Sequence, residues 1–178
     1  PPLAPTTNAN SIPPPPQSRE IHVIYSTDCS PYQTWQSYLL FYQAQQIKQP
    51  GYITRIVSGC DGVENGRQLL TDWHNEYIVP MNPNFKIHFT PTFDGTQDGG
   101  KKYSYFNKPF GLLHWLDNAI GTTDGVLNNE EIIVALIDPD MVIMRPITGD
   151  FDDGTIFFKR AEKAWGPDQP VPNRVQHG

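Results

Sequence analysis

One short stretch in the second half of the chain restricts the possible folds more than any other. Six apolar residues, Ile132–Ile137, are followed at once by Asp138-Pro139-Asp140 and then by a second apolar run, Met141–Met144. A continuous apolar run of this length is typical of a strand that is buried on both faces of a parallel sheet. Two carboxylates at its end need a partner, because burying an unpaired charge is costly. The stretch therefore predicts a buried strand that ends at a polar site.

The spacing of the two aspartates indicates what this site binds. Pro139 favours an extended conformation at Asp138, and residues two apart in an extended chain point to the same side. We therefore expect Asp138 and Asp140 to converge at the carboxyl end of the strand, where open α/β sheets bind ligands. Paired carboxylates suit Mn²⁺ or Mg²⁺, which take further ligands from water and phosphate oxygens. The alternative is an Asp-Pro-Asp surface turn, but the apolar residues on both sides favour the metal site.

Composition limits the classes of protein to consider. The 178 residues are enough for one domain with a hydrophobic core. A formal net charge of -6 argues against a nucleic-acid-binding surface, which needs clustered Lys and Arg. The apolar runs are too short to cross a bilayer. Because the chain does not begin with Met and stops without a closing element, we expect a piece of a longer protein, with any membrane anchor outside it.

The first 19 residues differ from the rest of the chain. They are rich in Pro, Asn, Thr and Ser, and include four consecutive prolines, Pro13–Pro16. Such a segment cannot bury enough apolar surface to fold and is expected to form a disordered, polyproline-like stem. A spacer is the favoured role, with an SH3-type ligand as the alternative. The folded domain is then expected to begin at Glu20 and to extend through residue 178, incomplete at its C-terminus.

The remaining chain alternates between strand-like and helix-like segments. The expected strands are Ile21–Ser26, Tyr52–Ser58, Lys86–Phe89, Ile132–Ile137 and a further strand through Ile147. The expected helices run from Pro31 to the break at Pro50-Gly51, over Arg67–Tyr77 and over Asn107–Ala119, and Pro91–Lys102 is expected to be a polar loop. This alternation predicts an α/β fold, an open and mostly parallel sheet with helices on both faces.

Two of these helices carry apolar residues at helical spacing, which predicts the faces they bury. In the first helix these residues are Trp35, Tyr38, Leu39, Tyr42 and Ile47. In the third they are Leu112, Leu113, Trp115 and Leu116. His114 lies among the latter and is assigned to the core rather than to a site. No Ser-His-Asp or Cys-His arrangement can be argued from the chain.

The two cysteines follow the first two expected strands. Cys29 comes after Thr27-Asp28, and Cys60 after Ser58-Gly59. If these strands are neighbours, as consecutive parallel strands often are, both thiols lie at one sheet edge. A Cys29–Cys60 disulfide would join two loops beside the ligand crevice and indicate an oxidising compartment. Two buried free thiols are an equal alternative.

Four further residues are candidates for a nucleotide site. Asp28 ends the first strand, where a nucleotide's base or ribose is usually held, although it could instead cap the following helix. Arg55, within the second strand, could reach a ribose or phosphate, but a structural ion pair is favoured. Asn107 and Lys108 stand at a helix start, where backbone N–H groups and a lysine suit a diphosphate. A solvated side chain is the alternative for Lys108.

Five segments of the chain resemble a plant and algal glycosyltransferase family. They are IHVIYSTDCSPYQTWQS, QPGYITRIVSGC, FTPTF, YFNKPFGLLHWL and VALIDPDMVIMRPI. Together they cover most of Glu20–Thr148 and include both cysteines. The family is that of the peptidyl serine α-galactosyltransferases and the related hydroxyproline O-arabinosyltransferases, and the galactosyltransferase side is the better match.

The resemblance implies a GT-A fold and a retaining transfer of galactose or arabinose from a UDP-sugar to a Ser or hydroxyproline hydroxyl of a glycoprotein. It implies a divalent metal, usually Mn²⁺, and an ER or Golgi lumenal location behind a membrane anchor. Asp138 and Asp140 would be the DxD pair that bridges metal and diphosphate. Asn107 and Lys108 would lie near the donor sugar and phosphates, and Asp28 near the nucleotide.

The chain departs from the family's pattern in the part that follows the DxD pair. Transferases of this fold commonly take a further metal ligand, often His, and much of the acceptor site from that part. Only Thr148–Gly178 remains here, and its single His, His177, is not assigned a role. Two alternatives stay open: a non-catalytic extracellular binding module on the same fold, and a sugar-phosphate nucleotidyltransferase.

Overall fold

The computed structural model describes residues 19–93, 95, 103–125 and 132–148. Its strands are β1 (Glu20–Asp28), β2 (Tyr52–Ser58), β3 (Phe85–Thr90) and β4 (Ile132–Ile137). Its helices are α1 (Pro31–Gln46), α2 (Gly66–Trp73) and α3 (Asn107–Trp115). Short helical turns are η1 (Cys60–Gly62), η2 (His74–Ile78), η4 (Ser104–Phe106) and η5 (Leu116–Ile120). The predicted stem and the end of the predicted domain lie outside the described residues, as does most of the predicted loop Pro91–Lys102.

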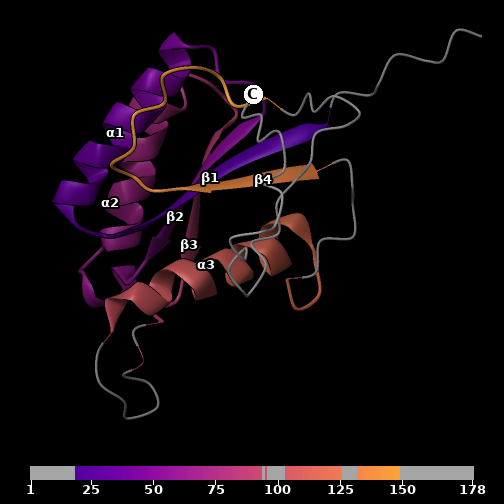
Figure 1. Cartoon of the computed structure of the whole chain (residues 1–178). Coiled ribbons are helices and arrows are strands. Elements are labelled where there is room, and N and C mark those ends of the chain that lie inside the picture. The colour runs from indigo at the N-terminus through magenta and orange to yellow at the C-terminus, as the bar shows by residue number, and fades with distance from the viewer. Residues whose placement is uncertain (1–18, 94, 96–102, 126–131, 149–178) are drawn as a thin grey trace, which may run out of the picture.

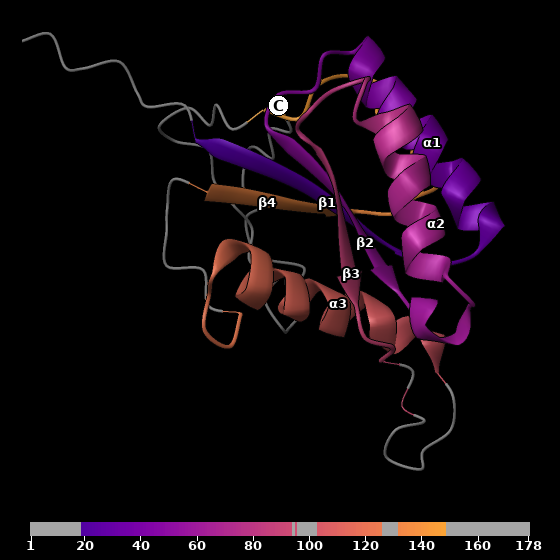
Figure 2. The ribbon, with the colours of Figure 1, turned by 180° about the vertical axis from the view of Figure 1, so that it is seen from behind.

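The four strands form one open sheet in the order β3-β2-β1-β4, and every neighbouring pair is parallel. Figures 1 and 2 show α1 and α2 on one face of this sheet and α3 on the other. The predicted α/β fold class is thus confirmed, and the described sheet is wholly rather than mostly parallel. No helix in the described part of the chain has the length and apolar character needed to cross a membrane.

The hydrophobic core lies on both faces of β1, because successive side chains of a strand point to opposite faces. Ile21, Val23 and Tyr25 pack in the cluster beneath α1. Ile24 packs on the other face with Trp115 of α3. This burial on both faces explains why β1 reads as a nearly continuous apolar run.

Helix α1 begins as predicted but buries a different face. Ser30 caps the helix, its Oγ accepting from the Gln33 N–H at 3.3 Å, and Pro31 is the first helical residue. The residues that α1 buries are Ser37, Leu40, Phe41 and Ala44. Of the predicted stripe, Trp35, Leu39 and Tyr42 are 74%, 54% and 45% exposed, so that prediction is wrong for them. The predicted residues and the buried residues both have helical spacing. The buried face is the one with Ser37 and Ala44, because these small side chains let the helix approach the sheet.

The other two helices lie close to their predicted ranges. Together, α2 and η2 span residues 66–78, and α3 and η5 span 107–120. Trp115 is buried as predicted, with Leu112 and Leu116 packed beside it. Leu113 is 38% exposed, so its assignment to the core is wrong.

The strand predicted through Ile147 does not form. The backbone turns directly after β4, where the Met141 N–H donates to the Asp138 carbonyl at 3.1 Å. The segment then runs without regular secondary structure, in orange in Figure 1, and Ile143 joins the core cluster beneath α1. The Gln49 side chain bonds both backbone groups of Ile147, each at 2.8 Å. These bonds replace the strand pairing that the apolar sequence predicts.

The turn at Gly51 provides a test of how the chain packs against the start of β1. Gly51 has φ of 76°, and a Cβ atom built on it would lie 2.2 Å from the backbone oxygen of Ile21. We expect Gly51→Ala to lower the free energy of unfolding by at least about 2 kcal/mol, because neither the left-handed backbone nor the β1 carbonyl can adapt. Urea denaturation measures the loss.

The matched control for this prediction is Gly62→Ala. No atom lies within 4 Å of a Cβ built on Gly62, so this change should shift the free energy of unfolding by no more than about 0.5 kcal/mol. Equal stabilities for the two variants would contradict the contact between Gly51 and β1.

Candidate functional site

The order of the strands indicates where a ligand could bind. The chain steps from β1 to β2 to β3 in one direction and then returns to place β4 on the other side of β1. Open α/β sheets bind ligands at such a reversal, outside the carboxyl ends of the strands. Here β1 ends in Asp28 and β4 is followed by Asp138, and the register pairs Tyr25 with Ile137. The two acidic residues thus stand at the same edge of the sheet.

Two of the predicted residues meet at this edge. Lys108, in the first turn of α3, donates from Nζ to Oδ1 of Asp138 and forms an ion pair with it. The two side chains are 40% and 47% exposed. An ion pair this exposed is worth at most about 1 kcal/mol. The pair therefore does little for stability, and it keeps a carboxylate and an ammonium group accessible side by side.

Asp140 lies in the turn that follows β4 and is exposed. Pro139 and Asp140 form this turn, as in the surface turn that was the alternative prediction. The chain is therefore not extended here, and the prediction that Asp138 and Asp140 point to the same side, which assumed an extended chain, does not apply. A turn leaves carboxylate oxygens able to bind a cation. Within the described ranges, no group of three or more His, Cys, Asp or Glu side chains could hold a metal ion. Two carboxylates suit a hard cation that keeps water and phosphate ligands, and they do not suit a closed structural zinc site.

Asp28 does not cap α1, the alternative to ligand binding, because Ser30 is the cap residue. Its Oδ1 accepts from the Ser30 N–H at 2.8 Å, and its own N–H donates to Oε1 of Gln33. These bonds shape the turn between β1 and α1. The residue is nevertheless exposed and lines a cleft at this edge of the sheet. Its position is therefore compatible with the predicted ligand role, whereas the capping role belongs to Ser30.

Arg55 is fully buried, and its hydrogen bonds hold the loop after β1, which carries Asp28. Its Nε donates to Oγ1 of Thr27 at 2.9 Å, and Nη2 donates to the Asp28 carbonyl at 3.2 Å and to Oγ1 of Thr34 at 3.3 Å. The guanidinium also lies 5.9 Å from the ring centre of Trp73. Burial lowers the pKa of Arg55, and the charges of Tyr25 and Asp28 oppose this shift. Its hydrogen bonds go to neutral oxygens rather than to the carboxylate of an ion pair, and they fix the loop that carries Asp28.

The two cysteines form the predicted disulfide. Cys29 and Cys60 are bonded, with their Cα atoms 5.1 Å apart. The bond joins the loop after β1 to η1, the turn after β2. It therefore holds together two of the loops that surround the carboxyl edge of the sheet.

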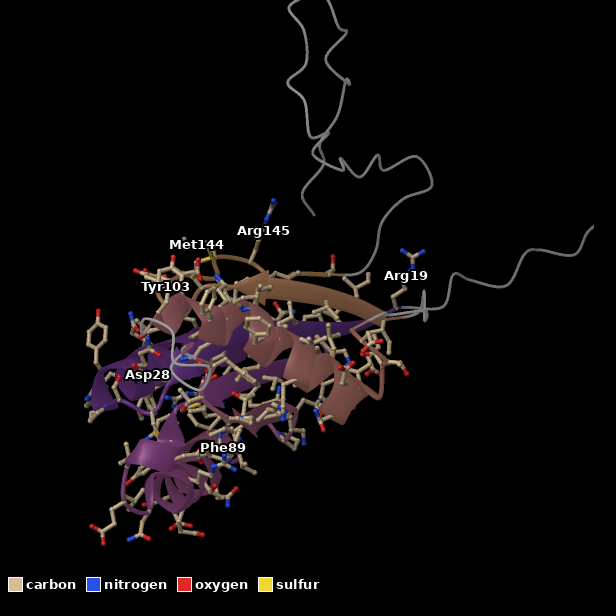
Figure 3. The ribbon with its side chains drawn as sticks, turned by 90° about the horizontal axis from the view of Figure 1, so that it is seen from below. Arg19, Asp28, Phe89, Tyr103, Met144 and Arg145 are labelled. Carbon is tan, nitrogen blue, oxygen red and sulfur yellow. A yellow bond between two sulfur atoms is a disulfide. The ribbon has the colours of Figure 1, made fainter. Side chains whose placement is uncertain are left out.

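A cleft of about 1170 Å³ opens at this edge. Its polar end, at the strand termini, is formed by Asp28, Ser58, Gly59, Thr92, Ser104 and Asn107. Its other arm runs between α1 and α2 and is lined by Trp35, Tyr38, Leu69, Trp73 and Tyr77. Figure 3 shows Asp28 and Tyr103 at one end of the sheet and Arg19 at the opposite end.

Asn107 connects the cleft to the ion pair. It lines the polar end and immediately precedes Lys108, and its Oδ1 accepts from the Phe93 N–H at 2.6 Å. The predicted residues Asp28, Asn107, Lys108 and Asp138 thus gather at one edge of the sheet. The aromatic arm was missed, because the spacing of Trp35 and Tyr38 suggested core positions. The lack of any charged residue in α1 was the signal that could have revealed it.

Comparisons with known proteins show what the chain is similar to. No protein-family model and no solved structure matches the chain. Over 129 residues it is 29% identical to the peptidyl serine alpha-galactosyltransferase of Arabidopsis thaliana, covering 72% of this chain and 14% of that protein. Over 126 residues it is 28% identical to the protein of the same name from Chlamydomonas reinhardtii, covering 71% of this chain and 14% of that protein. The predicted resemblance is confirmed: most of this chain is similar to a segment of the peptidyl serine alpha-galactosyltransferases.

Proposed function

We propose that this chain is the nucleotide-sugar-binding part of a glycosyltransferase that acts on a glycoprotein. The donor is a UDP-sugar, with galactose favoured over arabinose, and the acceptor is a Ser or hydroxyproline hydroxyl. The observation that carries the proposal is the Lys108–Asp138 pair, which stands where the strand order reverses, beside a cleft that Asn107 and Asp28 line. The names of the two relatives support galactose transfer to peptidyl serine.

Asp138 and Asp140 are the residues that would hold a divalent cation, Mn²⁺ or Mg²⁺. When bound, such a cation supplies a positive charge that stabilises the diphosphate leaving group. Lys108 supplies a second positive charge at the same place. Its ammonium group, which donates to Asp138, can also donate to a phosphate oxygen, because both acceptors are anionic oxygens.

The polar end of the cleft suits the rest of the donor. The Asp28 carboxylate can accept from a ribose hydroxyl or from the uracil N–H, and Arg55 and the disulfide fix the loop on which it stands. The Asn107 carbonyl oxygen is bound by Phe93, so its amide nitrogen is the group that can donate to a sugar hydroxyl. In a retaining transfer on one face of the sugar, the departing phosphate accepts the acceptor's proton. Such a mechanism requires no separate protein base.

The disulfide supports a proposed location in the ER or Golgi lumen. Disulfides form and persist in oxidising compartments such as the secretory pathway. Glycoprotein acceptors are available there. Attachment to the membrane, in this proposal, occurs through an anchor outside this chain.

A thermal-shift screen of nucleotide sugars with Mn²⁺ tests the proposed function. We expect UDP-galactose, at about 100 times its Kd, to add about 2.7 kcal/mol of stability, a rise in Tm of about 5–10 °C. The rise should be lost when EDTA removes the metal. Stabilisation by no nucleotide sugar would instead favour a non-catalytic module. A preference for nucleoside triphosphates would favour a nucleotidyltransferase.

A further inference from the structure

The outer face of α1 is unusual for a helix that faces solvent. Tyr32 and Trp35 are 71% and 74% exposed, and Leu39 and Tyr42 continue the same face at helical spacing. None of the 16 residues of α1 is charged. Exposed helix faces normally carry charged and polar side chains. An uncharged face with large apolar side chains indicates a surface that another segment covers.

Four rings form a row that crosses from α1 to α2. Trp35 and Tyr38 have ring centres 6.5 Å apart, Tyr38 and Trp73 are also 6.5 Å apart, and Trp73 and Tyr77 are 6.4 Å apart. All four line the arm of the cleft between the two helices. We call Trp35, Tyr38, Trp73 and Tyr77 the aromatic row.

Rows of Trp and Tyr side chains in a groove are the recognition surface for polyproline II segments. Such a segment is already extended before it binds, so docking it costs little conformational entropy. Its proline rings pack against aromatic faces, and the match does not require charge. The aromatic row therefore suits an uncharged, proline-rich chain better than a charged peptide or a helix.

This chain contains a segment of that kind. Seven of its first 18 residues are proline, including Pro13–Pro16, and none of the 18 carries a charged side chain. These residues lie outside the described part of the structure. The proline content of the segment matches the aromatic rings of the row, and neither the segment nor α1 carries a charged side chain.

The length of the segment is sufficient to reach the row. Helix α1 runs back from the carboxyl edge to the amino edge of the sheet, where Gly51 contacts Ile21 near the start of β1. At about 3.1 Å per residue, Pro13–Pro16 can lie about 12–22 Å from Glu20. The whole of residues 1–18 can extend about 56 Å. Helix α1 is only about 24 Å long, at 1.5 Å per residue.

We propose that the proline-rich segment Pro1–Pro16 docks as a polyproline II helix on the aromatic row of its own chain. Docked there, it covers the aromatic arm of the cleft and leaves the polar end, with Asp28 and Asn107, open. The proposal does not rest on the proposed function, because it is argued from the aromatic arm of the cleft and not from its polar end.

A competition experiment tests the docking. The probe is a fluorescent synthetic peptide of residues 8–18, and binding is followed by fluorescence anisotropy. The chain in which Pro13–Pro16 are replaced by Gly-Ser-Gly-Ser should bind the peptide at least about tenfold more tightly than the unaltered chain. In the unaltered chain, the tethered segment competes at an effective concentration of about millimolar.

Two further variants locate the site in the chain with the replaced prolines. Trp35→Ala should weaken peptide binding about tenfold or more, because central aromatic side chains dominate such interfaces. Tyr105→Ala removes an aromatic side chain that is 77% exposed outside the row, and it should leave binding unchanged. Both altered side chains are exposed, so circular dichroism should show the unaltered fold and Tm.

Four results would overturn the proposal. Equal peptide affinity of the unaltered and proline-replaced chains would exclude intramolecular docking. Absence of binding to the proline-replaced chain, or binding that Trp35→Ala does not weaken, would exclude the aromatic row as the site. A dimer of the unaltered chain that dissociates when the prolines are replaced, in sedimentation experiments, would assign the segment to a second copy.

Discussion

Replacing Cys29 and Cys60 together by Ser is expected to lower the free energy of unfolding by about 3–4 kcal/mol. The two cysteines are 31 positions apart, and closing a loop of this length in the unfolded chain removes entropy that corresponds to this amount. Losing the bond should also free the loops after β1 and β2, which it holds at the carboxyl edge of the sheet. Urea denaturation of the double variant and the unaltered chain measures the difference.

The matched control is the unaltered chain in a reducing agent. The sequence has only these two cysteines, so reduction affects no other bond. The reduced chain should unfold at the same urea concentration as the double variant. If the unaltered chain instead unfolds at the same concentration before and after reduction, the disulfide does not form in solution.

The strands could be predicted closely because their signals are local. The runs Tyr52–Ser58 and Ile132–Ile137 coincide with β2 and β4, and Ile21–Ser26 lies within β1. The signal for the start of α1 was also local, since Ser30 caps the helix and Pro31 is its first residue. Strand runs and helix caps depend on residues that are neighbours in the sequence, so they can be predicted from it directly.

The errors arose where the sequence allows two arrangements. In α1, two sets of residues share the helical period, and only packing against the sheet selects the one with Ser37 and Ala44. After β4, an apolar run usually predicts a strand, but bonds from the distant Gln49 hold Ile147 in a non-strand segment. Neither choice depends on residues near in sequence, so neither could be predicted from the local pattern.

The candidate site was predictable in its residues but not in its contacts. Asp28 and Asp138 were expected at the carboxyl edge, because parallel strands bring their ends together, and Lys108 was expected at a helix start that suits a diphosphate. The pairing of Lys108 with Asp138 depends on how α3 packs across the sheet, which the sequence does not specify. The contact between His88 and His114, with ring nitrogens 2.9 Å apart, was missed for the same reason.

The second large effect is expected at the two aspartates of the site. Asp140→Ala and Asp138→Asn should each reduce metal-dependent binding of UDP at least about 100-fold, because losing even an outer-shell partner of a metal costs about 10–100-fold. Asp140 is exposed and Asp138 is about half exposed, so neither change should lower the free energy of unfolding by more than about 1 kcal/mol. The weak binding in EDTA should not fall, since Asp28 and Asn107 are intact and each change removes a negative charge beside the diphosphate.

The control for these variants is Asp72→Ala. Asp72 is exposed on α2, and its Oδ1 accepts a hydrogen bond from Nε2 of Gln68 at 2.8 Å. The change removes the same charge from the molecule as Asp140→Ala does, away from the carboxyl edge of the sheet. It should leave UDP binding unaltered both with Mn²⁺ and with EDTA.

Calorimetric titration of UDP into the unaltered chain and into Asp140→Ala, each with Mn²⁺ and with EDTA, tests the central claim. We expect Mn²⁺ to tighten UDP binding to the unaltered chain and to have no effect on Asp140→Ala. Equal affinities for the two chains in Mn²⁺ would contradict a metal and nucleotide site at the end of β4.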